Sequence, residues 1–190
     1  MKERILSRIR RALQHRPKAA HPGAFTPPVP DSSSLERFAA HLEAAGGEVV
    51  RFASLEEAQA WLAEFARAFD GAAVSPLVPE ALRPELPEVP PERAPLAVSL
   101  ARAAVAETGT LLLDSREGRR LQLLAPVHLV WVRAHDVVDT LGVALKALEG
   151  ELPAAVGLHS GPSKSADIGQ IMVRGVHGPG RLIAGVLEAG

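Results

Sequence analysis

Cysteine is absent from this 190-residue chain. Without it the chain forms no disulfide, offers no thiolate nucleophile, and cannot bind zinc or an iron–sulfur cluster through sulfur. A cluster of that kind would have to be held by another protein.

Aromatic residues and net charge are also scarce. The sequence has no tyrosine and two tryptophans, and its formal net charge is -1. A nucleic-acid surface needs stacking side chains and a basic field, so we expect no nucleic-acid partner. The opening stretch MKERILSRIRRALQHR lacks the apolar core of a secretory signal, and no apolar run reaches the about 18 residues of a membrane span. We therefore expect a cytoplasmic protein without a transmembrane segment.

The first 32 residues differ in composition and hydrophobic pattern from the rest. Ile5, Leu6, Ile9 and Leu13 recur at helical spacing, which predicts an amphipathic helix over residues 2–14. Its basic side fits a membrane-surface or partner-binding helix, or an arm that docks on its own domain or on a second subunit of a homo-oligomer. The proline-rich stretch that follows predicts an extended linker. Residues 1–32 are thus an arm, and residues 33–190 the main domain.

Helical and strand patterns alternate from Ser34 onward. SLERFAAHLEAAGG and SLEEAQAWLAEFARAF predict helices, the second with a capping box at Ser54 and Glu57, and DVVDTLGVALKALEG predicts another. The predicted strands are EVVRF, GAAVS, LAVSL, LLAPVHLVWV, AAVGLHS and RLIAGVLEA, with AAVAETGTLLLDS also contributing to the sheet. This alternation predicts a three-layer α/β domain with a mainly parallel sheet.

Two turn clusters near the end of the sequence carry unusual chemistry. Parallel sheets bind ligands at the carboxyl ends of their strands, where we expect the turn after AAVGLHS to lie. Ser163 or Ser165 would cap a helix over Ile168, Ile171 and Met172, whose free N–H groups, with Lys164, suit a phosphate or carboxylate. Alternatively, this is an ordinary capped helix with a solvated lysine. The candidate ligand-binding residues of both clusters are Gly161, Ser163, Lys164, Ser165, Asp167, Gly175 and Gly178.

His177 and Glu107 are the candidate catalytic residues. His177 lies between glycines and is either a proton donor or acceptor or a turn histidine bonded to a carbonyl. Glu107 precedes Thr108-Gly109-Thr110 and the apolar run Leu111–Leu113, so we expect a desolvated carboxylate with an altered pKa, suited to a general base or acyl acceptor. It could equally be a structural carboxylate that accepts backbone or threonine hydrogen bonds. No spacing of ligands on one predicted helix points to a metal site.

Three segments together resemble the LUD domain family: AVAETGTLLL, LLAPVHLVWV and GPSKSADIGQIMVRGVHGPGRLIAGVLE. The resemblance runs from about Ala97 onward and rests on the order of Ala-Glu-Thr-Gly-Thr, Gly-Pro-Ser and Gly-Val-His-Gly-Pro. Ser165 stands where the family often has threonine, which keeps the hydroxyl.

The resemblance implies a fold similar to the sugar-phosphate isomerase and CoA-transferase-like superfamily. It also implies a component of a system that oxidises L-lactate to pyruvate with iron–sulfur partner proteins, this chain holding no cofactor itself. A small carboxylate or phosphate ligand would be bound through the C-terminal loops, with Thr108, Gly109 and Thr110 as further candidates. Two alternatives stay open: a CoA-transferase-like enzyme in which Glu107 forms an acyl intermediate, although Thr108 replaces the usual asparagine, and a non-catalytic scaffold.

Overall fold

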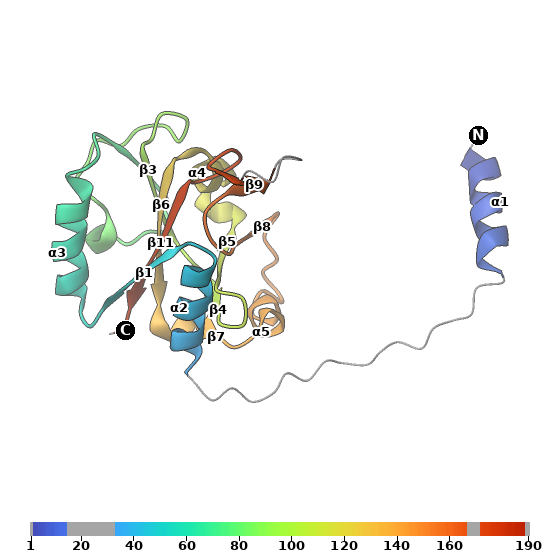
Figure 1. The fold of residues 1–190 in the computed structure, drawn as a ribbon, viewed down its shortest axis with the longest axis horizontal. Helices are drawn as coiled ribbons and strands as arrows, with labels where there is room; N and C mark the ends of the chain where they lie inside the picture. Colours follow the sequence, from blue (N-terminus) through green and yellow to red (C-terminus); the bar gives the residue numbers. More distant parts are fainter. Residues whose placement is uncertain (1, 15–32, 167–171, 189–190) are drawn as a thin grey trace. The chain divides into compact units, whose positions relative to one another are not determined.

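The computed structural model describes residues 2–14, 33–166 and 172–188 (Figure 1). The chain divides into two units, residues 1–31 and 32–190. The first contains α1 (Lys2–Leu13), the helix predicted for residues 2–14, and none of its residues is buried. Among the described helices, none is long and apolar enough to cross a membrane.

A five-stranded sheet forms the centre of residues 32–190. Each neighbouring pair of its strands is parallel, which confirms the predicted mainly parallel sheet. Successive residues of the central strand point to opposite faces, with Trp131 on one side and Val130 on the other. In spatial order the strands are β1 (Glu48–Phe52), β11 (Arg181–Leu187), β6 (Val127–Arg133), β3 (Leu96–Leu100) and β2 (Ala72–Val74).

One face of this sheet is covered by α3 (Leu55–Ala66) and the short helix η1 (Glu80–Leu82) (Figure 1). The α3 helix begins where predicted, because the Ser54 hydroxyl accepts the Glu57 N–H and the Glu57 carboxylate accepts the Ala53 N–H. Leu62 and Trp131 pack in the core between helix and sheet. The predicted helix of this segment is therefore confirmed with its cap.

The other face is covered by α2 (Ser34–Ala44) and a second sheet (Figure 1). Phe38 of α2, Leu111 and Leu113 of the second sheet, and Val130 of the parallel sheet share one core cluster. The N-cap of α2 is Ser33, whose hydroxyl accepts the N–H of Glu36. The strands of the second sheet, in spatial order, are β7 (Val137–Val138), β4 (Ala103–Val105), β5 (Thr110–Asp114) and β8 (Val156–His159).

The predicted three-layer α/β architecture is thus confirmed, with a second sheet in one outer layer. The remaining elements are η2 (Ser115–Glu117), α4 (Arg119–Leu124), η3 (Ala134–Asp136), α5 (Leu141–Lys146), β9 (Lys164–Ala166) and β10 (Met172–Arg174). The helix predicted over residues 136–150 is shorter than expected. Its first part is β7, which pairs in parallel with β4, so the helix begins only after the Thr140 cap.

The strand AAVGLHS is β8, but it is not part of the parallel sheet. It pairs antiparallel with β5 at the edge of the second sheet. Buried parallel strands read as continuous apolar runs, whereas Val156 and Leu158 are exposed and the strand ends in His159. The expectation that this strand delivers its turn to the carboxyl edge of the parallel sheet was wrong.

The described residues around the helix predicted after Gly161 are strands: Lys164–Ala166 form β9 and Met172–Arg174 form β10, and the two pair antiparallel. The Gly175 N–H donates to the Ser163 carbonyl at 2.9 Å, so these two positions meet. Asp167, Ile168 and Ile171 lie outside the described residues.

Candidate functional site

Glu107 lies in the turn between β4 and β5, on the surface. Its side chain is exposed, and its carboxylate accepts the N–H of Leu141 at 2.7 Å, at the first residue of α5. The expectation of a desolvated carboxylate was therefore wrong: the turn projects beyond the strands and leaves the side chain in solvent. This geometry corresponds to the structural alternative, a carboxylate at a helix N-terminus.

The residues after Glu107 hold the turn against its neighbours. Hydroxyl oxygens form a chain from Thr108 to Thr110 (2.7 Å) and from Thr110 to Ser160 (2.5 Å). Gly109 has φ +60°, and a Cβ there would lie 2.2 Å from the backbone nitrogen of Leu42 in α2. Only glycine fits this close approach. The polar residues of this turn thus bond to one another and to the residue that follows β8.

The two C-terminal loops contact each other. The Ser163 N–H donates to the Pro179 carbonyl at 2.8 Å, and the Ser163 hydroxyl accepts the N–H of His177 at 3.3 Å. The Lys164 ammonium donates to the carbonyl of Ala45. The side chain of His177 is exposed. The loop residues thus bond to the body of the domain and to each other, with Gly178 against the Ser163 side chain, Gly161 against Ala45, Gly175 bonded to Ser163, and Ser165 paired with Val173.

These loops lie at the amino-terminal ends of the parallel strands. Ala45 precedes β1, Pro179 precedes β11, and the N–H of Arg181 donates to the carbonyl of Pro126, which precedes β6. The structure brings Ser163, Gly175, His177 and Gly178 together, while the carboxylate of Glu107 is directed to α5. The C-terminal loops therefore occupy the edge opposite to the one that the sequence predicted.

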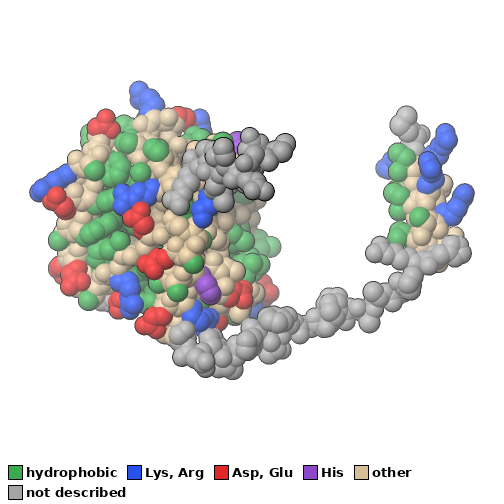
Figure 2. All heavy atoms as spheres, viewed as in Figure 1, with side chains coloured by type: hydrophobic (Ala, Val, Ile, Leu, Met, Phe, Trp, Pro, Cys, Tyr) green, Lys and Arg blue, Asp and Glu red, His purple; other side chains and the backbone are tan. Residues whose placement is uncertain are grey.

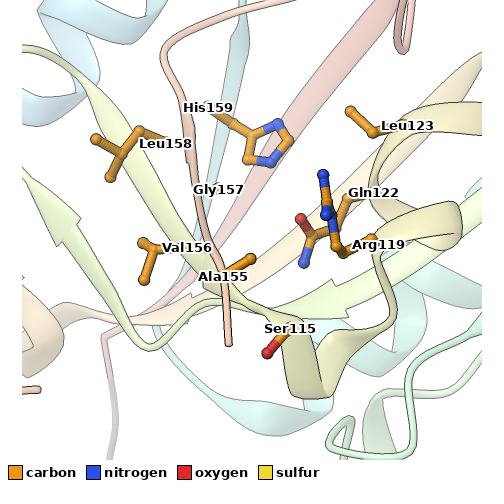
Figure 3. Close-up of a pocket in the computed structure, with 9 residues that line it drawn as sticks. All are labelled: Ser115, Arg119, Gln122, Leu123, Ala155, Val156, Gly157, Leu158 and His159. Atoms are coloured by element: carbon orange, nitrogen blue, oxygen red, sulfur yellow. The ribbon is translucent and has the colours of Figure 1, made fainter. Parts of the chain in front are cut away.

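A cleft of about 330 Å³ lies between β8, η2 and α4. Figure 3 shows the guanidinium of Arg119 and the imidazole of His159 directed into the same space, with Gln122 beside them and Leu158 pointing away on the other side of the strand. The Gln122 amide donates to the Asp114 carbonyl at 2.8 Å, which fixes its orientation. The lining residues are Ser115, Arg119, Gln122, Leu123, Ala155, Val156, Gly157, Leu158 and His159.

Glycine at position 157 makes this arrangement possible. A Cβ there would lie 2.7 Å from Nε2 of His159 and 2.9 Å from the side-chain oxygen of Gln122. Both polar groups therefore approach the β8 backbone more closely than any other residue would permit. The cleft thus brings the Arg119 guanidinium, the His159 imidazole and the Gln122 amide oxygen together beside the backbone of Gly157.

A cluster of buried polar residues, Ser75, Ser99, Glu117 and His128, lies behind His159. His128 is 0% exposed, and its Nε2 is 2.9 Å from the Ser99 hydroxyl. The rings of His128 and His159 are perpendicular, with centroids 6.1 Å apart. Glu117 is 1% exposed and accepts the N–H of Leu100 at 3.2 Å. Within the described residues, Oε1 of Glu117 and Nδ1 of His128 have no hydrogen-bond partner.

Burial sets the protonation of this buried polar cluster. It lowers the pKa of His128 to about 3, with a smaller contribution from neighbouring His159, and it also lowers the pKa of His159. Burial raises the pKa of Glu117, opposed by the Ser75 hydroxyl, the Leu100 N–H and the Ser99 hydroxyl. Both imidazoles are therefore neutral at pH 7, and each retains one nitrogen that can accept a hydrogen bond or a proton.

Other features of the described residues offer less chemistry. A larger hollow of about 610 Å³ lies between α3 and η1, but its Arg83 is paired with its own Glu80 at 3.6 Å. In the part of the chain that the structure describes, no three histidine, cysteine or carboxylate side chains gather as a metal site. The cleft beside His159 is thus the better candidate.

The cleft and the buried polar cluster were not predicted from the sequence. The available signal was a polar residue inside an otherwise apolar strand, namely Ser99 in LAVSL and His128 in VHLVWV. Fully buried polar side chains are uncommon and need partners, so such interruptions are informative. Glu117 gave no signal, because DSREGRR reads as a solvated loop.

Fold and cleft define a three-layer α/β protein with a polar site beside its parallel sheet. The solved structure of a DUF162 family protein from Deinococcus radiodurans is similar, with a TM-score of 0.63 and 21% identity, over 85% of this chain and 100% of that one. Residues 92–185, about half of the chain, match the LUD domain. The resemblance drawn from the sequence is confirmed.

Curated relatives agree with this assignment. Lactate utilization protein C 1 of Bacillus mycoides is 38% identical over 94 residues, which are 45% of this chain and 40% of the relative. Lactate utilization protein C of Deinococcus radiodurans is 36% identical over 104 residues, 52% of this chain and 49% of the relative. The chain thus spans less than half the length of these relatives. Ser99, Glu117, Arg119, His128 and His159 all lie inside the LUD match.

Proposed function

We propose that this protein is a component of a lactate-utilization system and binds a small 2-hydroxy or 2-oxo carboxylate in the cleft between β8 and α4. The LUD domain and the names of its relatives support the system. The observation that carries the ligand site is the shared direction of Arg119 and His159 into one cleft of about 330 Å³ (Figure 3). This volume suits a small metabolite.

Each end of such a ligand has a counterpart in the cleft. Within the described residues Arg119 forms no ion pair, so its planar guanidinium is available to a carboxylate in a two-bond arrangement. The neutral imidazole of His159 is suited to hydrogen-bond the 2-hydroxyl or 2-oxo group. Leu123 and Ala155 offer apolar surface for the methyl group.

The oxidation of lactate determines what the partner proteins would have to accept. Oxidation to pyruvate breaks the O–H bond of the 2-hydroxyl group and the C–H bond of the carbon that bears it, and it releases two protons and two electrons. In this proposal His159 accepts the hydroxyl proton, because burial keeps it neutral. The two electrons and the second proton leave to partner proteins that carry iron–sulfur clusters, since this chain has no cysteine to hold one.

The contacts of the other candidates favour the cleft over the alternatives. Lys164 and Ser163, the expected anion donors, are bonded to Ala45 and His177. Glu107, the expected acyl acceptor of a CoA-transferase-like enzyme, is exposed and bonded to the start of α5.

Isothermal titration of the purified chain with L-lactate and with pyruvate tests this proposal. Removing a charge-assisted contact costs about 1.5–3 kcal/mol, so Arg119→Gln should weaken binding by about 10- to 150-fold. Arg120→Gln is the matched control, because the neighbouring Arg120 pairs with Glu92 and does not line the cleft. Its affinity should equal that of the unchanged protein.

Three results would overturn the ligand site. The first is absence of binding by either carboxylate, which would favour a non-catalytic scaffold. The second is an equal loss of affinity in Arg119→Gln and Arg120→Gln, which would indicate a general charge effect. The third is a loss in Lys164→Ala with none in Arg119→Gln, which would return the ligand to the C-terminal loops.

A further inference from the structure

Helix α1 has two chemically distinct sides. Ile5, Ile9 and Leu13 follow one another at intervals of four residues, so they lie along one side of the helix. Figure 2 shows hydrophobic side chains along one side of this helix and most of its arginine and lysine side chains on the other. An apolar stripe beside a basic side gives α1 the strongly amphipathic character of a helix that binds a surface.

The charge of the chain is unevenly divided. The segment Lys2–Leu13 has five basic residues and one acidic residue, out of 21 basic and 22 acidic residues in the chain. The remaining sequence therefore has 16 basic and 21 acidic residues. The helix α1 thus has a net positive charge while the rest of the chain has a net negative charge, which points to an anionic binding surface for α1.

We propose that α1 binds an anionic lipid bilayer surface, lying in the interface with Ile5, Ile9 and Leu13 toward the acyl chains. Strong amphipathicity, a polar side rich in arginine and a low overall hydrophobicity are the properties of interfacial helices. Arg8 and Arg10 flank the apolar stripe on its two sides, so their long side chains reach the headgroups while the stripe is buried. This proposal is independent of the proposed ligand cleft.

A lipid surface fits α1 better than an acidic protein groove. Protein interfaces depend on a few anchor residues, among which tryptophan, tyrosine and arginine dominate, in shaped pockets. The apolar stripe of α1 consists of isoleucine and leucine and has no aromatic anchor. Acyl chains need no complementary shape, and anionic headgroups accept positive charge at any position along the helix. The composition of α1 therefore fits an anionic lipid surface and lacks the aromatic anchors typical of a protein interface.

Co-sedimentation of the full chain with lipid vesicles tests this proposal. We expect binding to phosphatidylcholine vesicles that contain phosphatidylserine, weak binding to pure phosphatidylcholine, and release as the salt concentration rises from about 0.1 M to about 1 M. Each arginine near such a surface changes affinity by about fivefold, so Arg8→Gln/Arg11→Gln should bind about 25-fold more weakly. Ile5→Gln/Ile9→Gln should bind at least about tenfold more weakly.

The double variant Arg67→Gln/Arg120→Gln is the matched control, because it removes the same charge from exposed positions outside α1. It should keep its vesicle affinity. Absence of binding to the anionic vesicles would overturn the proposal, and so would an equal loss in the control variant. A change in oligomeric state of Ile5→Gln/Ile9→Gln without vesicles, seen by analytical ultracentrifugation, would also overturn it, because the stripe would then bind protein.

Discussion

The cleft with its buried polar cluster and the glycine-rich turns differ in how their polar groups are used. In the turns, Glu107, Ser163 and Lys164 each bond to a backbone group of a neighbouring segment. Behind the cleft, Glu117 and His128 are buried and each keeps one polar atom without a partner among the described residues. The polar side chains of the turns hydrogen-bond to neighbouring segments of the chain, whereas the buried polar cluster keeps polar atoms that form no hydrogen bond among the described residues.

This difference shows that a turn rich in polar residues is not necessarily a ligand-binding site. A turn with glycine, proline and hydroxyl residues has to satisfy many backbone groups by itself, and polar side chains do this. A polar group inside a strand has a cost on burial, which calls for another reason to keep it. The glycine-rich turns are therefore expected to affect stability and the cleft to affect ligand binding.

The largest effect is expected for Gly109→Ala. A Cβ at this position would lie 2.2 Å from the Leu42 nitrogen, and its φ of +60° is unfavourable for alanine. The free energy of unfolding should fall by at least about 3 kcal/mol, measured by urea denaturation. Gly150→Ala is the control, with φ +93° and no atom within 4 Å, and should cost about 1 kcal/mol. Equal losses would contradict the close packing of the turn on α2.

The next effect is a pH dependence caused by His128. Its pKa is about 3 when folded, against 6.5 for an unperturbed histidine, so the unfolded chain binds a proton that the folded protein excludes. Stability due to this group is complete above pH 6.5 and is lost as the pH falls toward 3. Between pH 6.5 and pH 4.5 the loss is about 3 kcal/mol at most. Urea denaturation at several pH values should show a flatter slope in this range for His128→Gln.

His135→Gln is the control for this slope, because His135 is an exposed surface histidine. Its pH profile should match that of the unchanged protein. His159 contributes in the same direction as His128, since burial also lowers its pKa. Glu117 acts in the opposite direction: its raised pKa means that stability is lost as the pH rises from 4.5 toward its folded value. An unchanged slope in His128→Gln would contradict the buried neutral histidine.

The smallest effect is expected for Lys164→Ala. Its ammonium donates to the Ala45 carbonyl on the surface, so its removal should lower the free energy of unfolding by about 1 kcal/mol. The affinity for lactate or pyruvate should not change, because Lys164 does not line the cleft. Thermal melts and titration of the same variant measure both quantities. A weaker ligand affinity with unchanged stability would reverse the comparison between the two regions.

Local patterns in the sequence predicted much of the fold. The helices α2 and α3 have apolar residues at helical spacing and a serine cap, and β3 and β6 are apolar runs between turn signals. The features that these local patterns did not predict depend on contacts between segments that are distant in the sequence. The strand β8 joins the second sheet through β5, and Met172, which was expected in a helix, lies in β10, which pairs antiparallel with β9.

The site was harder to predict than the fold because its residues share no pattern. Ser99, Glu117, His128 and His159 come from four different elements, and they meet only because β3 and β6 pair and η2 folds beneath them. Ser99 and His128 stood out as polar residues in apolar strands. Glu117 lies in a charged stretch that predicts exposure, yet it is 1% exposed. Only the tertiary structure reveals that it is buried.

The position of β11 between β1 and β6 has a consequence for synthesis on the ribosome. Glu48 of β1 pairs with Ile183, so β1 has no partner in the sheet until a segment more than a hundred residues later has been made. Until then β1 and β6 both present unpaired backbone and apolar side chains, which are sites of misassociation. Pairing over such a separation is slow to form. The nascent chain therefore completes its central sheet only after β11 has been synthesised.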